Sequence, residues 1–188
     1  PVDSQYTSGA RTTSSTRHRV LWAGRFSRQK KIDLLSRIVF NMPDVMFDVY
    51  GYAYDKSELD TISLLENLPN VTIHGHFDDF ANIVQEDHAC LLYTSAWDGM
   101  PNILLEAASM HLPIVASLTG GISDLINTRT GYPIGSDSGH EHYCTAIRTI
   151  IRDPEGAKLR ADAAYSYIKH NHSFTNFSDS LMKMYGAE

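Results

Sequence analysis

Short apolar runs alternate with amphipathic stretches along most of this chain. The runs are rich in β-branched and aromatic residues and are bounded by turn formers, which predicts strands. They lie at 20–23, 46–50, 71–73, 89–93, 114–117 and, more weakly, 132–134. Apolar residues recur with a helical period between them, at 32–40, 56–66, 80–85, 102–110 and 122–127. Strands alternating with helices predict an α/β fold with a doubly wound, Rossmann-like parallel sheet.

The two ends of the chain depart from this alternation. Residues 1–17 are rich in Ser, Thr and Gly, which predicts a flexible linker or tail before one domain at 18–188. The carboxyl-terminal part has helical periodicity at 140–152, 155–170 and 174–185. The apolar stripe of 174–185 either packs on this domain or forms an uncovered patch. In a sheet of this kind, ligands are expected at the carboxyl ends of the strands.

Composition narrows the class of protein. The 188 residues carry a formal net charge of −6, which argues against general nucleic-acid binding through a basic surface. Cys90 and Cys144 form no disulfide framework, which favours a reducing, cytoplasmic environment. No apolar run approaches the roughly 20 residues that span a bilayer. The histidines form no close set with cysteines or acids, so we expect no metal and no other cofactor.

The segment 98–106 combines two acids with a helix start. Pro101 suits the first turn of a helix, and Asp98 lies in the loop that leads into it. Glu106 falls inside a nearly unbroken apolar run, where a carboxylate is costly unless a partner or a ligand satisfies it. The segment either binds a ligand or combines an acid at a helix start with a Glu paired to a buried Arg.

Two further loops carry candidate binding groups. Residues 24–31 hold four cations after the first strand, beside Gly24, which allows close backbone approach. Cations at a helix start suggest an anionic ligand such as a diphosphate, although a solvated basic loop would look the same. Gly120 and Gly121 follow a later strand, where they form either an anion-binding or sugar-binding turn or simply a tight turn. The three loops together outline a crevice at one edge of the sheet.

These motifs as a set resemble the carboxyl-terminal domain of a group 1 retaining glycosyltransferase with the GT-B fold. The resemblance runs from about residue 19 to the end of the chain. It is carried by Gly24-Arg25 with Lys30, Asp98-Gly-x-Pro-Asn-x-x-x-Glu106-Ala, Pro113-Ile-Val-Ala-Ser and Gly120-Gly121.

The resemblance implies a role for each matched residue. Arg25 and Lys30 would hold the donor diphosphate, with Lys31 as a substitute for Lys30. Asp98 would lie near the transferred sugar and complete the catalytic group with Arg25 and Lys30. Glu106 would bind ribose hydroxyls. The remaining substrate-binding positions are Gly24, the sugar and phosphate contacts Gly99, Met100, Pro101, Asn102, Gly120 and Gly121, and the base-binding loop Gly75, His76 and Phe77.

The implied reaction transfers a sugar from a nucleotide diphosphate sugar with retention of anomeric configuration, without a metal, for example in polysaccharide biosynthesis. The family's amino-terminal acceptor domain is absent, so the fragment is expected to bind nucleotide without turnover. The full enzyme could associate peripherally with a membrane. Asp98 is shorter than the usual Glu, and Lys31 and His111 stand where glycine is common.

Two other functions stay open. A sugar-nucleotide epimerase would share the fold but would need a different acidic set. A non-catalytic nucleotide-binding or interaction module would use the same crevice without reaction. Binding to one nucleotide in a panel would separate a donor-binding domain from an interaction module.

Overall fold

The computed structural model describes residues 19–53 and 59–171. It contains one parallel sheet of six strands in the order β3-β2-β1-β4-β5-β6. The strands are β1 (Arg19–Ala23), β2 (Met46–Tyr50), β3 (Val71–Gly75), β4 (His88–Tyr93), β5 (Ile114–Leu118) and β6 (Tyr132–Gly135). The predicted α/β, Rossmann-like parallel sheet is therefore confirmed, and the strand order reverses between β1 and β4.

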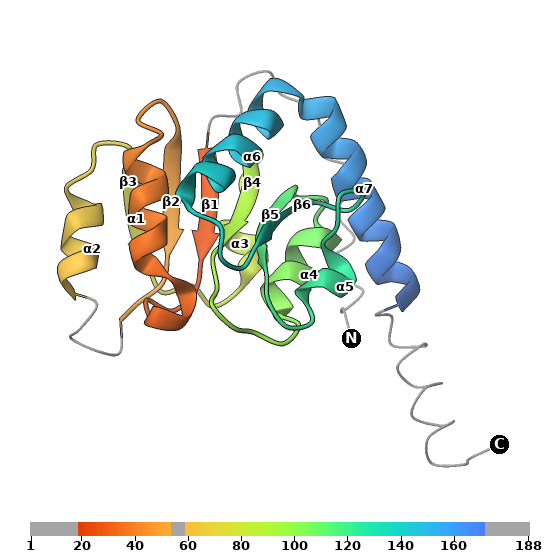
Figure 1. Ribbon diagram of the computed structural model, residues 1–188, viewed down its shortest axis with the longest axis horizontal. Helices are drawn as coiled ribbons and strands as arrows, with labels where there is room; N and C mark the ends of the chain where they lie inside the picture. The colour runs from red at the N-terminus through yellow and green to blue at the C-terminus, as the bar shows by residue number, and fades with distance from the viewer. Residues whose placement is uncertain (1–18, 54–58, 172–188) are drawn as a thin grey trace, which may run out of the picture.

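Helices cover both faces of this sheet (Figure 1). One core lies beneath α1, α2 and α6, and the other lies beneath α3, α4, α5 and part of α7. The helices are α1 (Ile32–Phe40), α2 (Leu59–Glu66), α3 (Phe80–Ile83), α4 (Asn102–Ser109), α5 (Ile122–Leu125), α6 (His140–Arg152) and α7 (Pro154–Asn171). Strand β4 is buried at every position, as expected for a central strand between two helical layers.

Several helix boundaries differ from the prediction. Helices α3 and α5 each end two residues early, because Val84 and Ile126 return to extended backbone. A 3-10 helix, η2 (Arg28–Lys30), occupies part of the basic loop 24–31. The first residues of the predicted helix 56–66 and the whole of 174–185 lie outside the described residues, as does the tail 1–17.

A buried carboxylate joins four strands on the face that also carries α3. Asp48 of β2 is 1% exposed and accepts hydrogen bonds from Arg19 Nε at 2.7 Å and Arg19 Nη2 at 2.6 Å. It also lies 2.7 Å from His74 Nε2 and 3.0 Å from His88 Nε2. Burial raises the pKa of Asp48, but the hydrogen bonds from His88, Arg19 and His74 outweigh burial and hold that pKa well below its usual range. The carboxylate is therefore ionised and fully partnered.

Candidate functional site

Three loops meet at the carboxyl edge of the sheet, after β1, β4 and β5. The β1 and β4 loops are joined by the Ala96 N–H, which donates to Gln29 O at 2.8 Å, and by Gln29 Nε2, which donates to Trp97 O at 2.8 Å. The β4 and β5 loops also touch, because a Cβ on Gly120 would lie only 1.8 Å from the Asp98 carbonyl oxygen. Gly120 has φ +55°, so glycine is needed there for both conformation and space. The structure thus brings together three loops that are up to 97 residues apart, from Gly24 to Gly121.

Lys30 and Asp98 form an ion pair at the centre of this edge. Lys30 Nζ lies 2.6 Å from Asp98 Oδ2, and the two side chains are 13% and 21% exposed. Lys30 also donates to the hydroxyl of Tyr93 at 2.6 Å, and that hydroxyl donates to Asp98 Oδ2. The three groups therefore contact one another in a closed triangle. Sequence reasoning missed Tyr93, because it lies in an apolar run and reads as an ordinary strand residue.

Charge in this cluster is balanced before any ligand binds. Burial raises the pKa of Asp98, but hydrogen bonds from Lys30 and Tyr93 and the Lys30 charge outweigh burial and hold that pKa below its usual range. Burial and the neighbouring Asp98 carboxylate raise the pKa of Tyr93 far above its usual range, so the phenol stays protonated. The ammonium of Lys30 is accordingly compensated by one carboxylate.

Hydrogen bonds from β1 and from the residue after β4 fix the backbone around Lys30. Thr94 Oγ1 donates to Lys30 O at 2.7 Å and accepts from Trp22 Nε1 at 3.0 Å, and the Trp22 side chain is buried. The next residue, Lys31, has φ 49° and donates to Ser136 O at 2.9 Å. His111 is the other described non-glycine residue with positive φ, at 54°. The two positions where we noted a missing glycine are thus the ones that take the left-handed conformation glycine favours.

Arg25 and Glu106 present charges that the described residues leave without a partner. Arg25 is exposed and makes no hydrogen bond or ion pair within 19–53 and 59–171. The Glu106 carboxylate likewise makes neither in that part of the chain, so the predicted alternative of a buried Arg partner is not observed there. Burial and the nearby Asp79 raise the pKa of Glu106. A half-buried acid without a protein partner is consistent with a ligand-binding role.

Helix α4 is largely covered, and it starts just after Pro101. Leu104, Ala107, Ala108 and Ser109 are buried, Ile103 and Leu105 are partly buried against the same core, and Asn102 is exposed. Pro101 is the N-cap residue, with extended backbone, and α4 begins at Asn102. No side chain of the described residues caps this helix start, which leaves backbone N–H groups of the first turn open, next to Gly99 and Met100 in the sequence.

The loop after β3 carries the aromatic residues predicted to hold a base. Gly75 has φ +79° and open space around it, and His76 is exposed. Phe77 meets Tyr50 edge to face, with ring centroids 6.2 Å apart. Tyr50 in turn stacks on His74 with centroids 4.4 Å apart. Asp48 holds that histidine, so the buried carboxylate indirectly supports this aromatic cluster.

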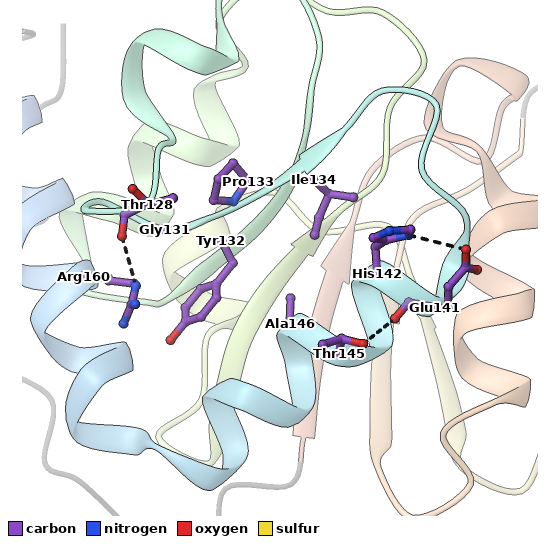
Figure 2. A pocket seen from close by; sticks show the side chains of 10 residues that line it. All are labelled: Thr128, Gly131, Tyr132, Pro133, Ile134, Glu141, His142, Thr145, Ala146 and Arg160. Atoms are coloured by element: carbon purple, nitrogen blue, oxygen red, sulfur yellow. Dashed lines mark hydrogen bonds and ion pairs between the residues drawn. The ribbon is translucent and has the colours of Figure 1, made fainter.

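A separate hollow of about 380 Å³ lies between β6, α6 and α7 (Figure 2). None of the predicted site residues lines it. Its cation, Arg160, is already engaged, because Nε donates to Thr128 O at 3.2 Å and Nη1 donates to Gly156 O at 3.0 Å. The guanidinium carbon also lies 4.9 Å from the centre of the Tyr132 ring. The candidate chemistry therefore belongs to the carboxyl edge and not to this hollow.

The described residues contain no cluster of three or more His, Cys, Asp or Glu side chains that could hold a metal ion. Within the same part of the chain, no helix is both long enough and apolar enough to cross a bilayer.

The amino-acid sequence of the chain matches a known protein family. Residues 17–153 match the family model described as glycosyl transferases group 1. Sulfoquinovosyl transferase SQD2 of Arabidopsis thaliana is 26% identical over 157 residues, which is 77% of this chain and 29% of that protein.

Solved structures share the fold at lower identity. A mutant of S. aureus TarM in complex with UDP is 21% identical, with a TM-score of 0.81 over 96% of this chain and 38% of that one. Anabaena HepE in complex with UDP is 17% identical, with a TM-score of 0.78 over 92% of this chain and 50% of that one. The chain thus spans half or less of each of these relatives.

Proposed function

Since the chain belongs to the group 1 glycosyltransferase family and has the fold of a GT-B carboxyl-terminal domain, we propose that it is the donor-binding half of a retaining enzyme. That enzyme would transfer a sugar from a nucleotide diphosphate sugar to an acceptor. The observation that carries the proposal is a Lys30–Asp98 pair near one edge of the sheet, together with Arg25 and a half-buried Glu106 that have no partner among residues 19–53 and 59–171.

The cations suit the diphosphate. Arg25 is free to form a two-pronged contact with phosphate oxygens, and Lys30 supplies a compact charge. In the reaction, negative charge builds on the leaving diphosphate, and fixed cations lower the free energy of that transition state. Asp98 would lie against the transferred sugar, with the open N–H groups of the α4 start beside it.

The acids and aromatic residues suit the nucleoside. The Glu106 carboxylate would accept hydrogen bonds from ribose hydroxyls, which would also compensate for its burial. Gly75, His76 and Phe77, supported by Tyr50, would lie against the base. Gly120 and Gly121 would bring main-chain groups close to the sugar or phosphates.

The acceptor site belongs, in this proposal, to an amino-terminal domain outside the chain, which is supported by the partial coverage of the relatives. We therefore expect the fragment to bind nucleoside diphosphate without sugar transfer. Turnover by the purified fragment, with contaminating enzymes excluded, would contradict this division of labour. A cytoplasmic location and a part in polysaccharide biosynthesis complete the proposal.

A thermal-shift panel of UDP, GDP, ADP and their sugars tests the binding function. A ligand at a hundredfold excess over its Kd stabilises the folded state by about 2.7 kcal/mol, which gives a clear shift in Tm. The control is Glu106→Gln, which keeps the size of the side chain and removes its charge. No shift with any member of the panel would contradict donor binding and favour an interaction module. A catalysed change of sugar configuration would favour an epimerase.

A further inference from the structure

The hydroxyl of Tyr93 lies between two side chains that the proposed function assigns to the donor. It accepts a hydrogen bond from Lys30 Nζ at 2.6 Å and donates one to Asp98 Oδ2. Lys30 Nζ is also 4.6 Å from the centre of the Tyr93 ring, so the ring and the hydroxyl both contact the ammonium. Tyr93 itself is 2% exposed and is therefore shielded from direct contact with a ligand.

The Lys30, Tyr93 and Asp98 cluster keeps unused hydrogen-bond donors and acceptors for a ligand. An ammonium group has three N–H donors, and Lys30 uses two of them on Tyr93 and Asp98. One donor remains for a phosphate oxygen. Asp98 Oδ2 receives both Lys30 and Tyr93, while Oδ1 accepts only the Gly99 N–H at 3.2 Å among the described residues. One N–H donor of Lys30 is thus left for the diphosphate, and acceptor capacity on Asp98 Oδ1 is left for the sugar.

Tyr93 is also the most firmly held member of the cluster. It is the last residue of β4 and pairs with Ala116 of β5, in the centre of the sheet. Lys30 and Asp98, in contrast, are carried by loops after β1 and β4. Without the hydroxyl, the carboxylate of Asp98 would be the one remaining hydrogen-bond partner of the ammonium among the residues that the structure describes, and it competes with phosphate for it.

We propose that Tyr93 is a positioning residue, whose hydroxyl fixes Lys30 and Asp98 relative to each other so that the donor diphosphate meets an oriented ammonium. The inference rests on the proposed function, because it assigns Lys30 to the diphosphate. Tyr93 acts through Lys30 and Asp98 and touches no substrate.

The test compares Tyr93→Phe with Tyr143→Phe in the full chain. Both are buried tyrosines, but the Tyr143 hydroxyl lies near Ser117, in the core on the other face of the sheet, and makes no hydrogen bond to Lys30 or Asp98. Calorimetry measures UDP, GDP and ADP and their parent nucleosides. For the nucleotide that binds, Tyr93→Phe should weaken diphosphate binding by about three- to tenfold, the effect of one net hydrogen bond. Nucleoside binding should stay unchanged, as should both affinities in Tyr143→Phe.

A second variant shows whether Tyr93 acts through Lys30. In a Lys30→Ala background, adding Tyr93→Phe should change diphosphate affinity by less than about twofold, because the partner of the hydroxyl is gone. Equal loss of nucleoside and diphosphate binding would overturn the inference and make the role of Tyr93 structural. Unchanged diphosphate binding in Tyr93→Phe would overturn it also. Wild-type protein that binds no nucleoside diphosphate would instead overturn the proposed function, and the inference with it.

Discussion

Replacing Asp48 by Asn should destabilise the protein strongly without changing the shape of the side chain. The carboxylate is 1% exposed and receives two hydrogen bonds from Arg19 and one each from His74 and His88. The amide group would bring its own N–H donors against those donors and would leave Arg19 only its longer ion pair, with Asp87 at 3.5 Å. Breaking a buried ion pair on one side costs about 3–5 kcal/mol, against a total stability of about 5–15 kcal/mol for a domain.

Urea unfolding at neutral pH measures this loss, with Asp44→Asn as the matched control. Asp44 also makes a two-pronged pair, with Arg148 Nη1 and Nη2 each at 2.9 Å, but the two side chains are 60% and 37% exposed. An exposed pair contributes about 0–1 kcal/mol, so the two substitutions should differ by at least about 2 kcal/mol. Equal losses in the two variants would refute the argument that burial makes the Asp48 network important.

Acidification removes the stabilisation that the ionised Asp48 provides. Its pKa is lower in the folded than in the unfolded state, so its contribution is complete above the unfolded pKa, near 4, and is lost as the pH falls below that value. The difference between wild type and Asp48→Asn should therefore be largest at neutral pH and should shrink below pH of about 4. A difference that grows on acidification would contradict the assignment.

Three further predictions concern the candidate site. Glu106→Gln should weaken nucleotide binding by roughly ten- to a hundredfold in calorimetry, because a hydrogen bond to a charged group contributes about 1.5–3 kcal/mol. Unchanged affinity would show that Glu106 has a structural role. Arg25→Ala should weaken diphosphate binding far more than nucleoside binding, since only the diphosphate carries charge, and equal losses would speak against phosphate contact. Lys31→Gly should raise the free energy of unfolding, measured in urea, by about 0.5–1 kcal/mol, because the φ of 49° at this position suits glycine. A lower free energy of unfolding would instead show that the hydrogen bond from Lys31 to Ser136 O contributes more than the relief of strain.

The sheet was predictable because its signal is local. Each strand is a short apolar run, and the run at 46–50 became β2 at the same bounds. Asp48 interrupts that run, and its partners lie 26 to 40 residues away in the sequence. Only the parallel register, which places β1 and β3 on either side of β2, brings Arg19 and His74 to the same carboxylate. Local periodicity carries no information about that pairing.

The candidate site was also predictable only in part: its location follows from local sequence, but its side-chain contacts do not. Loops after β1, β4 and β5 had to meet, because parallel strands end at one edge, and that follows from the strand pattern. The contact between Lys30 and Asp98 depends on side-chain reach across 68 residues of sequence. The sequence did not indicate a role for the Tyr93 hydroxyl, because the ring of this residue fits the apolar pattern of β4. The spacing of the motifs along the sequence thus predicted which edge of the sheet carries the site. The packing of the folded chain determines which side chains at that edge form pairs.

The close fit of Gly120 against the Asp98 carbonyl has a consequence for protein engineering. Any side chain at position 120 would push the β4 loop away, and Gly121 lies against Gly99 at ordinary contact distance, because a Cβ there would be 3.5 Å from the Gly99 oxygen. The two loops therefore form one exchangeable unit. A graft that seeks a new donor preference should transplant residues 94–101 and 119–121 together, since either loop alone would meet a backbone surface shaped for the other.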